Sequence, residues 1–218
     1  MIHPIEGVKI KMIKFTNDLK KEISSLVINN DKSKLINYLD NLKSNDKIIP
    51  GGNEYYLRKF LSWLKYGGKL PFNVFKVGNS KLPFLNFSTL PGKTCPGAGD
   101  CLTYCYSFKA WRYPAPFFSQ CQNTLLMINN FDIIETELKK IINTSKFNKL
   151  EKIDFRLYVD GDFANYEQII NWMNLLHKLP KISAYGYSKS LNLFLELADQ
   201  QFQFPKNYVL NSIHCTNF

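Results

Sequence analysis

The sequence has no long apolar run. Within its 218 residues no stretch approaches the length that a bilayer-spanning helix needs, and residues 1–6 lack the apolar core of a secretory signal. Both absences predict a cytoplasmic protein without a membrane partner. Cysteine is also scarce. The chain has five cysteines, an odd number that cannot all pair in disulfides within the chain. In a reducing compartment, clustered cysteines indicate metal ligands rather than a disulfide framework.

Acidic residues are the minority charge. The chain has 18 of them against 28 basic residues, which gives a net charge of +10 and an isoelectric point near 9.3. This excess favours a polyanionic partner such as nucleic acid, but scattered lysines also serve solubility, and no basic run forms a compact patch. No Walker or nuclease motif is present. With 45% hydrophobic residues, the chain has enough apolar surface for a packed core.

Three of the five cysteines lie within eleven residues, at Cys95, Cys101 and Cys105, in the spacing Cys-x5-Cys-x3-Cys. Glycine and proline between the first two allow the backbone to curl around a small group. The second gap is compatible with the first turn of a helix, which would place Cys101 and Cys105 on one face. Three converging thiolates favour a soft metal centre, either iron–sulfur or zinc. The alternative is three buried small residues.

The two remaining cysteines are candidates for a fourth ligand. Cys121 falls within a predicted helix, where a lone cysteine is often a core residue. Cys215, next to His214, follows the last predicted strand. A fourth thiolate would turn an open catalytic site into a closed structural one.

Residues 9–66 are predicted to be mostly helical and basic, in three helices separated by turn residues at 29–31 and 49–53. We therefore expect an N-terminal helical subdomain over residues 1–68. It either caps one end of the core or binds nucleic acid or another partner.

Residues 69–218 change to a pattern of strands and helices. Helices are predicted at 166–179 and 191–200 between the last three strands, and this order is typical of a parallel sheet with right-handed crossovers. An aromatic and basic segment, residues 106–113, follows the cysteines. Its rings could stack on a base or cofactor ring, or pack the helix on the sheet. The predicted strands are residues 72–77, 82–87, 153–159, 182–187 and 208–212.

Polar residues follow the last three predicted strands, at the sheet edge where the cysteine loop is also expected. They could bind a cofactor ribose or amino group, form an acid/base pair, cap a helix, or contact a phosphate or carboxylate. We predict Asp160, Asp162 and Lys189 as catalytic residues. We predict Asp160, Asp162, Ser188 and Asn211 as cofactor-binding residues.

Several motifs resemble those of the gene product 88 family of phage proteins, in order and in spacing. That family is similar in layout to radical S-adenosylmethionine enzymes, although the usual spacing there is Cys-x3-Cys-x2-Cys. The matching motifs span about residues 84–212 and are Leu90-Pro91-Gly92-x-Thr94-Cys95-Pro96, Cys101-x3-Cys105-Tyr106, Asn123, Arg156-x3-Asp160-Gly161-Asp162-Phe163 and Tyr185-x-Tyr187-Ser188-Lys189-Ser190.

The resemblance implies an α/β fold of a particular kind, a partial parallel βα barrel (TIM-like) over residues 69–218. It also implies a [4Fe–4S] cluster on Cys95, Cys101 and Cys105 with S-adenosylmethionine at the open iron, in the cytoplasm of a bacterial or phage-infected cell. The expected function is then an iron–sulfur enzyme acting on a nucleotide, nucleic acid or peptide. The alternative is a zinc- or cluster-stabilised nucleic-acid-binding protein of a phage or plasmid, without catalysis.

Overall fold

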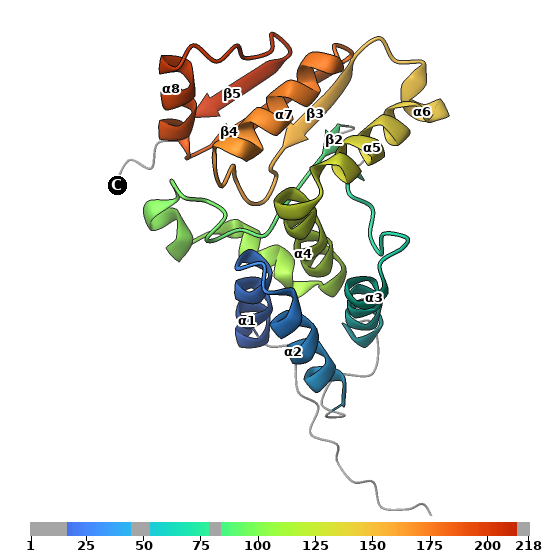
Figure 1. Cartoon of the computed structure of the whole chain (residues 1–218). Helices are drawn as coiled ribbons and strands as arrows, with labels where there is room; N and C mark the ends of the chain where they lie inside the picture. The colour runs from blue at the N-terminus through green and yellow to red at the C-terminus, as the bar shows by residue number, and fades with distance from the viewer. Residues whose placement is uncertain (1–16, 45–52, 79–83, 213–218) are drawn as a thin grey trace, which may run out of the picture.

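The structure is a computed structural model that describes residues 17–44, 53–78 and 84–212. A five-stranded sheet lies at one end of the molecule and helices α1–α3 lie at the other, with α4 between them (Figure 1). The helices are α1 (Asn17–Ile28), α2 (Lys32–Ser44), α3 (Asn53–Tyr66), α4 (Pro114–Asn129), α5 (Phe131–Ile142), α6 (Ser145–Asn148), α7 (Tyr166–Lys178) and α8 (Leu191–Asp199), with 3-10 turns η1 (Gly99–Thr103) and η2 (Tyr106–Arg112).

The strands are β1 (Lys76–Val77), β2 (Leu85–Asn86), β3 (Ile153–Leu157), β4 (Ile182–Ser188) and β5 (Tyr208–Ser212). They follow one another across the sheet in chain order, β1 antiparallel to β2 and all other pairs parallel. The predicted α/β class and parallel arrangement are confirmed. The TIM-like barrel is not confirmed, because the sheet formed by the described strands is open, with β1 and β5 at its two edges. A barrel would require these edges to pair.

The first strand is shorter than predicted, and side chains of α4 explain why. The backbone N–H of Phe72 donates to Gln122 Oε1, and its carbonyl accepts from Gln122 Nε2, both at 3.0 Å. The carbonyl of Val74 accepts from Asn123 Nδ2 at 2.9 Å. These amides satisfy backbone groups that a strand ladder would otherwise use, so only Lys76 and Val77 pair with β2.

One face of the sheet is buried and the other is more open. Along β3, Ile153, Phe155 and Leu157 are buried, whereas Asp154 is exposed and Arg156 half-buried, as strand alternation requires. The buried face packs on α7, whose Trp172 ring lies 5.7 Å from that of Phe155. This packing is the sheet core, to which α4, α5 and α8 also contribute.

A second, helical core joins α1, α2 and α3 to α4. From α4 it includes Phe117, Phe118 and Cys121, and it also includes Leu90 and Trp111. Residues C-terminal to the predicted boundary at residue 68 therefore complete the core of the N-terminal helices. The division into residues 1–68 and 69–218 stays a prediction.

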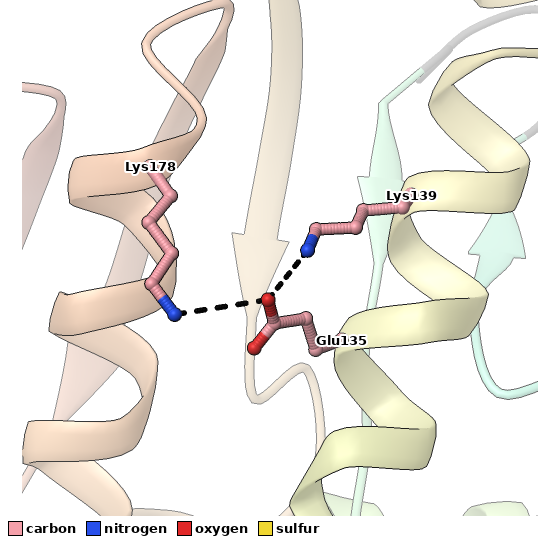
Figure 2. A network of polar contacts seen from close by, with 3 residues as sticks. All are labelled: Glu135, Lys139 and Lys178. Carbon is pink, nitrogen blue, oxygen red and sulfur yellow. Dashed lines mark hydrogen bonds and ion pairs between the residues drawn. The ribbon is translucent and has the colours of Figure 1, made fainter.

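An exposed ion-pair network joins α5 to α7 beside the sheet core. Glu135 Oε1 lies 2.6 Å from Lys139 Nζ on the same helix and 3.8 Å from Lys178 Nζ on α7, as Figure 2 shows. Hydrogen bonding from Lys139 holds the pKa of Glu135 below its usual value. No described helix combines the length and apolar character that crossing a membrane requires.

Candidate functional site

The segment after β2 delivers the cysteine loop to the carboxyl edge of the sheet. The N–H of Val159 donates to the carbonyl of Phe87 at 2.9 Å, and the N–H of Thr89 donates to the carbonyl of Asp160 at 3.0 Å. The chain therefore continues alongside the end of β3 and enters the cysteine loop there. The N–H of Leu90 then donates to Thr124 Oγ1 of α4 at 3.0 Å, which anchors the start of the loop.

Tight turns curl the loop between its first two cysteines. The N–H of Cys95 donates to the carbonyl of Gly92 at 2.9 Å, and the N–H of Cys101 donates to that of Ala98 at 2.9 Å. Gly97 touches the end of β4, because a Cβ at this position would lie 1.9 Å from the carbonyl oxygen of Lys189. Only glycine allows this approach.

Cys101 and Cys105 do not share an α-helix, so that expectation was wrong. Cys101 lies in η1, which ends at Thr103, and Cys105 precedes η2 with φ −56° and ψ 116°. The Thr103 hydroxyl donates to the carbonyl of Asp100 at 2.8 Å within η1. A 3-10 helix rarely runs for more than a few residues, and η1 ends at Thr103, before the chain reaches Cys105.

All three cysteines line one cavity of about 400 Å³, which we call the cysteine pocket. Asp162 and Lys189, predicted from the ends of β3 and β4, line it too. The structure therefore brings together five of the predicted site residues at the carboxyl edge of the sheet. The remaining lining residues are Pro91, Ala98, Leu102, Tyr106, Ser107, Arg156, Tyr158, Val159, Gly161 and Tyr187.

The pocket disfavours a bare thiolate. Burial, with smaller contributions from the nearby Asp162 and Cys105, raises the pKa of Cys95 to about 11 against hydrogen bonds from Gly92 and Thr94. Without a cation the Cys95 thiol is therefore protonated at neutral pH. Among the described residues, no three side chains of His, Cys, Asp or Glu form a group that could hold a metal ion.

The Asp162 carboxylate is used to join two loops. It accepts hydrogen bonds from Ser188 Oγ at 2.8 Å, the Lys189 N–H at 2.9 Å, Ser190 Oγ at 3.3 Å and the Phe163 N–H at 2.7 Å. Burial raises its pKa, and these donors oppose the shift. Ser188, predicted to bind a cofactor, is buried, and its hydroxyl donates to Asp162.

Asp160 lines a different cavity, of about 420 Å³, which we call the Asp160 pocket. Its carboxylate accepts from Gln120 Nε2 at 3.0 Å, and Gln120 Oε1 accepts from Trp111 Nε1 at 2.9 Å. Gly161, with φ +80°, turns the chain between the two aspartates. Asp160 and Asp162 therefore do not face one another as an acid/base pair.

Three other candidates lie away from the cysteine pocket or outside the described residues. The Asn211 side chain donates to the carbonyl of Gly186 at 3.2 Å within the sheet and does not line the pocket. Cys121 is fully buried in the helical core, where burial raises its thiol pKa well above the usual value. The candidate Cys215, with His214, lies outside the described residues.

Sequence reasoning missed the functional potential of Arg156, Tyr158 and Tyr187. Tyr158 has φ +52°, a left-handed conformation that is strained for an aromatic residue, and such strain concentrates at functional sites. A basic residue in the middle of a strand with three buried neighbours was the signal that could have singled out Arg156.

Comparison with known proteins matched the chain to a family model. The family model described as "Gene product 88" matches residues 42–214, which include α3, α4, the cysteine loop and the whole sheet. No curated protein and no solved structure matches the chain significantly.

Proposed function

The chain belongs to the gene product 88 family, and we propose that it is an iron–sulfur protein with an enzymatic role. Cys95, Cys101 and Cys105 would hold a [4Fe–4S] cluster, and the ligand or substrate would bind in the rest of the cysteine pocket. The observation that carries this proposal is the lining of that one pocket. Three thiols of one loop face it together with side chains from the ends of two parallel strands.

A cluster and a single zinc ion place different demands on the spacing of the thiols. Zinc holds its sulfur ligands about 2.3 Å from one centre, so that the sulfurs come within about 4 Å of each other. No three described side chains of the kinds that ligate metals are grouped in this way. A four-iron cluster is polyatomic and spaces its thiolates more widely, and the cavity of about 400 Å³ has room for it.

The charges of the pocket also suit a cationic centre. Cluster binding requires thiolates, and the positive charge of iron would reverse the effect of burial on Cys95, with release of protons. Arg156 and Lys189 lie in the same wall and would offset the negative charge that three thiolates bring. We therefore expect cluster loading to depend on pH and to improve as pH rises.

When bound, a cluster held by three protein thiolates offers one-electron chemistry and one iron open to a further ligand, for which S-adenosylmethionine is our proposed occupant. The protein's own groups would bind and orient that ligand. Lys189 and Arg156 can bind an anionic group, and Tyr106 and Tyr187 line the same cavity. Asp162 has four donors already and acts as a positioning residue for the loop that carries Lys189.

The test is the colour of anaerobically purified protein. We expect a broad absorbance near 400 nm, as is typical of thiolate-held iron–sulfur clusters. Cys95→Ala, Cys101→Ala and Cys105→Ala should each lose it, whereas the control Cys121→Ala, whose thiol lies in the helical core, should keep it. Colourless wild-type protein that carries zinc would reject the cluster and favour a structural metal.

A further inference from the structure

The cysteine pocket is lined by exposed aromatic rings and by basic groups. Tyr106 is 57% exposed and Tyr187 is 42% exposed. Arg156 and Lys189 line the same cavity. We call these four residues the aromatic wall.

The two rings of the aromatic wall are held in place by their neighbours. The Tyr106 hydroxyl donates to the carbonyl of Val159 at 2.6 Å, which fixes the ring while leaving it exposed. Tyr187 lies between two groups: Arg156 Cζ is 5.3 Å from its ring centroid, and the Tyr185 ring meets it edge-on at 6.3 Å. Rings fixed in this way lose little conformational entropy when a planar group stacks on them.

Arg156 has an unused donor. Its Nε is buried and has no hydrogen-bond partner among the described residues. Buried donors without a partner are rare, and each suggests a ligand or an ion. A guanidinium matches the oxygens of a phosphate well, because its N–H groups form a rigid fork.

The surroundings of the wall favour an anionic ligand. Asp162 is the acidic residue that lines the pocket, and its carboxylate is occupied by four donors. The Asp160 carboxylate, in the neighbouring cavity, is close enough to act on Arg156 and Tyr106, but hydrogen bonds with Ser107, Ser88 and Gln120 occupy it. Lys109 and Arg112 lie on η2, which begins at Tyr106. The whole chain carries a net charge of +10.

We propose that the aromatic wall binds single-stranded nucleic acid, with a base stacked on Tyr187 or Tyr106 and the adjacent phosphate on Arg156 and Lys189. Stacking needs bases whose faces are free, so single strands fit this wall and duplexes do not. The inference deepens the proposed function, on which it rests in one respect: it places the strand, as substrate, at the mouth of the pocket that holds the sulfurs.

The experiment measures fluorescence anisotropy of labelled oligo-dT and oligo-U with anaerobically purified wild-type protein over a series of salt concentrations. We expect binding that weakens with salt, and about 5- to 100-fold weaker binding for Tyr187→Ala, from the loss of one stacked base. Tyr187→Phe should restore it, because the ring remains. Arg156→Gln should reduce the salt slope by about one phosphate contact.

Tyr66→Ala is the matched control, because Tyr66 is 82% exposed on α3, outside the cysteine pocket. It should bind like the wild type. An absence of oligonucleotide binding, or equal losses in Tyr66→Ala and Tyr187→Ala, would overturn the inference. Tighter binding of a duplex than of the single strand would also overturn it.

The two proposals fail separately. Wild-type protein that loads a cluster but does not bind the strand contradicts this inference alone. Protein without a cluster that binds the strand in a Tyr187-dependent way contradicts the proposed function alone.

Discussion

Two cavities of similar volume, about 400 and 420 Å³, share Val159 at the end of β3, yet they differ in how they use their carboxylates. In the cysteine pocket, the Asp162 carboxylate accepts hydrogen bonds from the end of β4 and the loop that follows it. In the Asp160 pocket, the Asp160 carboxylate accepts a hydrogen bond from Gln120 of α4, and side-chain hydrogen bonds with Ser107 and Ser88 also hold it. Two aspartates separated by one glycine therefore serve two sites. The one beside the thiols acts as a structural joint, which leaves ligand binding there to sulfur and basic groups.

The largest effect is expected from replacing Asp162, which holds together the loops that follow β3 and β4. Asp162→Ala leaves two buried serine hydroxyls and two backbone N–H groups without their acceptor, so we expect it to lower the free energy of unfolding by about 3 kcal/mol. Asp160→Ala should cost about 1–2 kcal/mol, because the hydrogen bonds to its carboxylate come from side chains (Ser107, Ser88 and Gln120), which can reorient, and Gln120 keeps its bond from Trp111. Urea unfolding of both variants measures the difference. Equal losses would remove the distinction between the two cavities.

Gly97→Ala should separate the loop from the sheet. The new Cβ would meet the Lys189 carbonyl, and relief requires movement of backbone, at a cost of about 1–3 kcal/mol. We expect bound iron to be lost with little change in the sheet core. Iron content and circular dichroism measure the two effects. The loop control is Asp100→Ala, on η1, and normal iron in Gly97→Ala would show that this contact does not position the cysteines.

The two carboxylates should also give stability a pH dependence. Burial raises the pKa of both above the ordinary value of 3.8. Each then binds a proton more readily in the folded than in the unfolded chain. Its contribution to stability is complete below pH 3.8 and is lost as the pH rises through its raised pKa. Unfolding measured across this range should show the loss in the wild type and a smaller loss in Asp162→Asn. The same loss in both proteins would assign the pH dependence to other groups.

The smallest effect is expected at Glu135, a carboxylate at the surface. Glu135 is half-buried and pairs with the exposed Lys139 and Lys178. Glu135→Ala should therefore change the free energy of unfolding by at most about 1 kcal/mol, and less at high salt. A loss as large as that of Asp162→Ala would mean that burial does not explain the ranking.

The convergence of the cysteine loop with the ends of β3 and β4 could be predicted from the sequence. Alternation along residues 153–157 and 182–188 identifies strands, and parallel strands bring their carboxyl ends to one edge. The short first strand of the sheet could not be predicted in this way. Whether residues 72–74 join a ladder depends on amides of α4 that lie about 50 residues away in the chain.

Sequence patterns also could not predict that Asp160 and Asp162 line different cavities. An extended chain would place residues two apart on the same side, but Gly161 adopts a positive φ that only the folded environment selects. Likewise, nothing local indicates that Tyr187 and Arg156, on neighbouring strands, contact each other. Pairing register, which is a property of the assembled sheet, decides this contact.

The account depends most on what the three cysteines hold. The direct measurement is the content of iron, acid-labile sulfide and zinc per chain in anaerobically purified wild-type protein. We expect roughly four irons and as many sulfides per chain, with little zinc, as a [4Fe–4S] cluster requires. About one zinc per chain without sulfide, or no metal at all, would contradict the account.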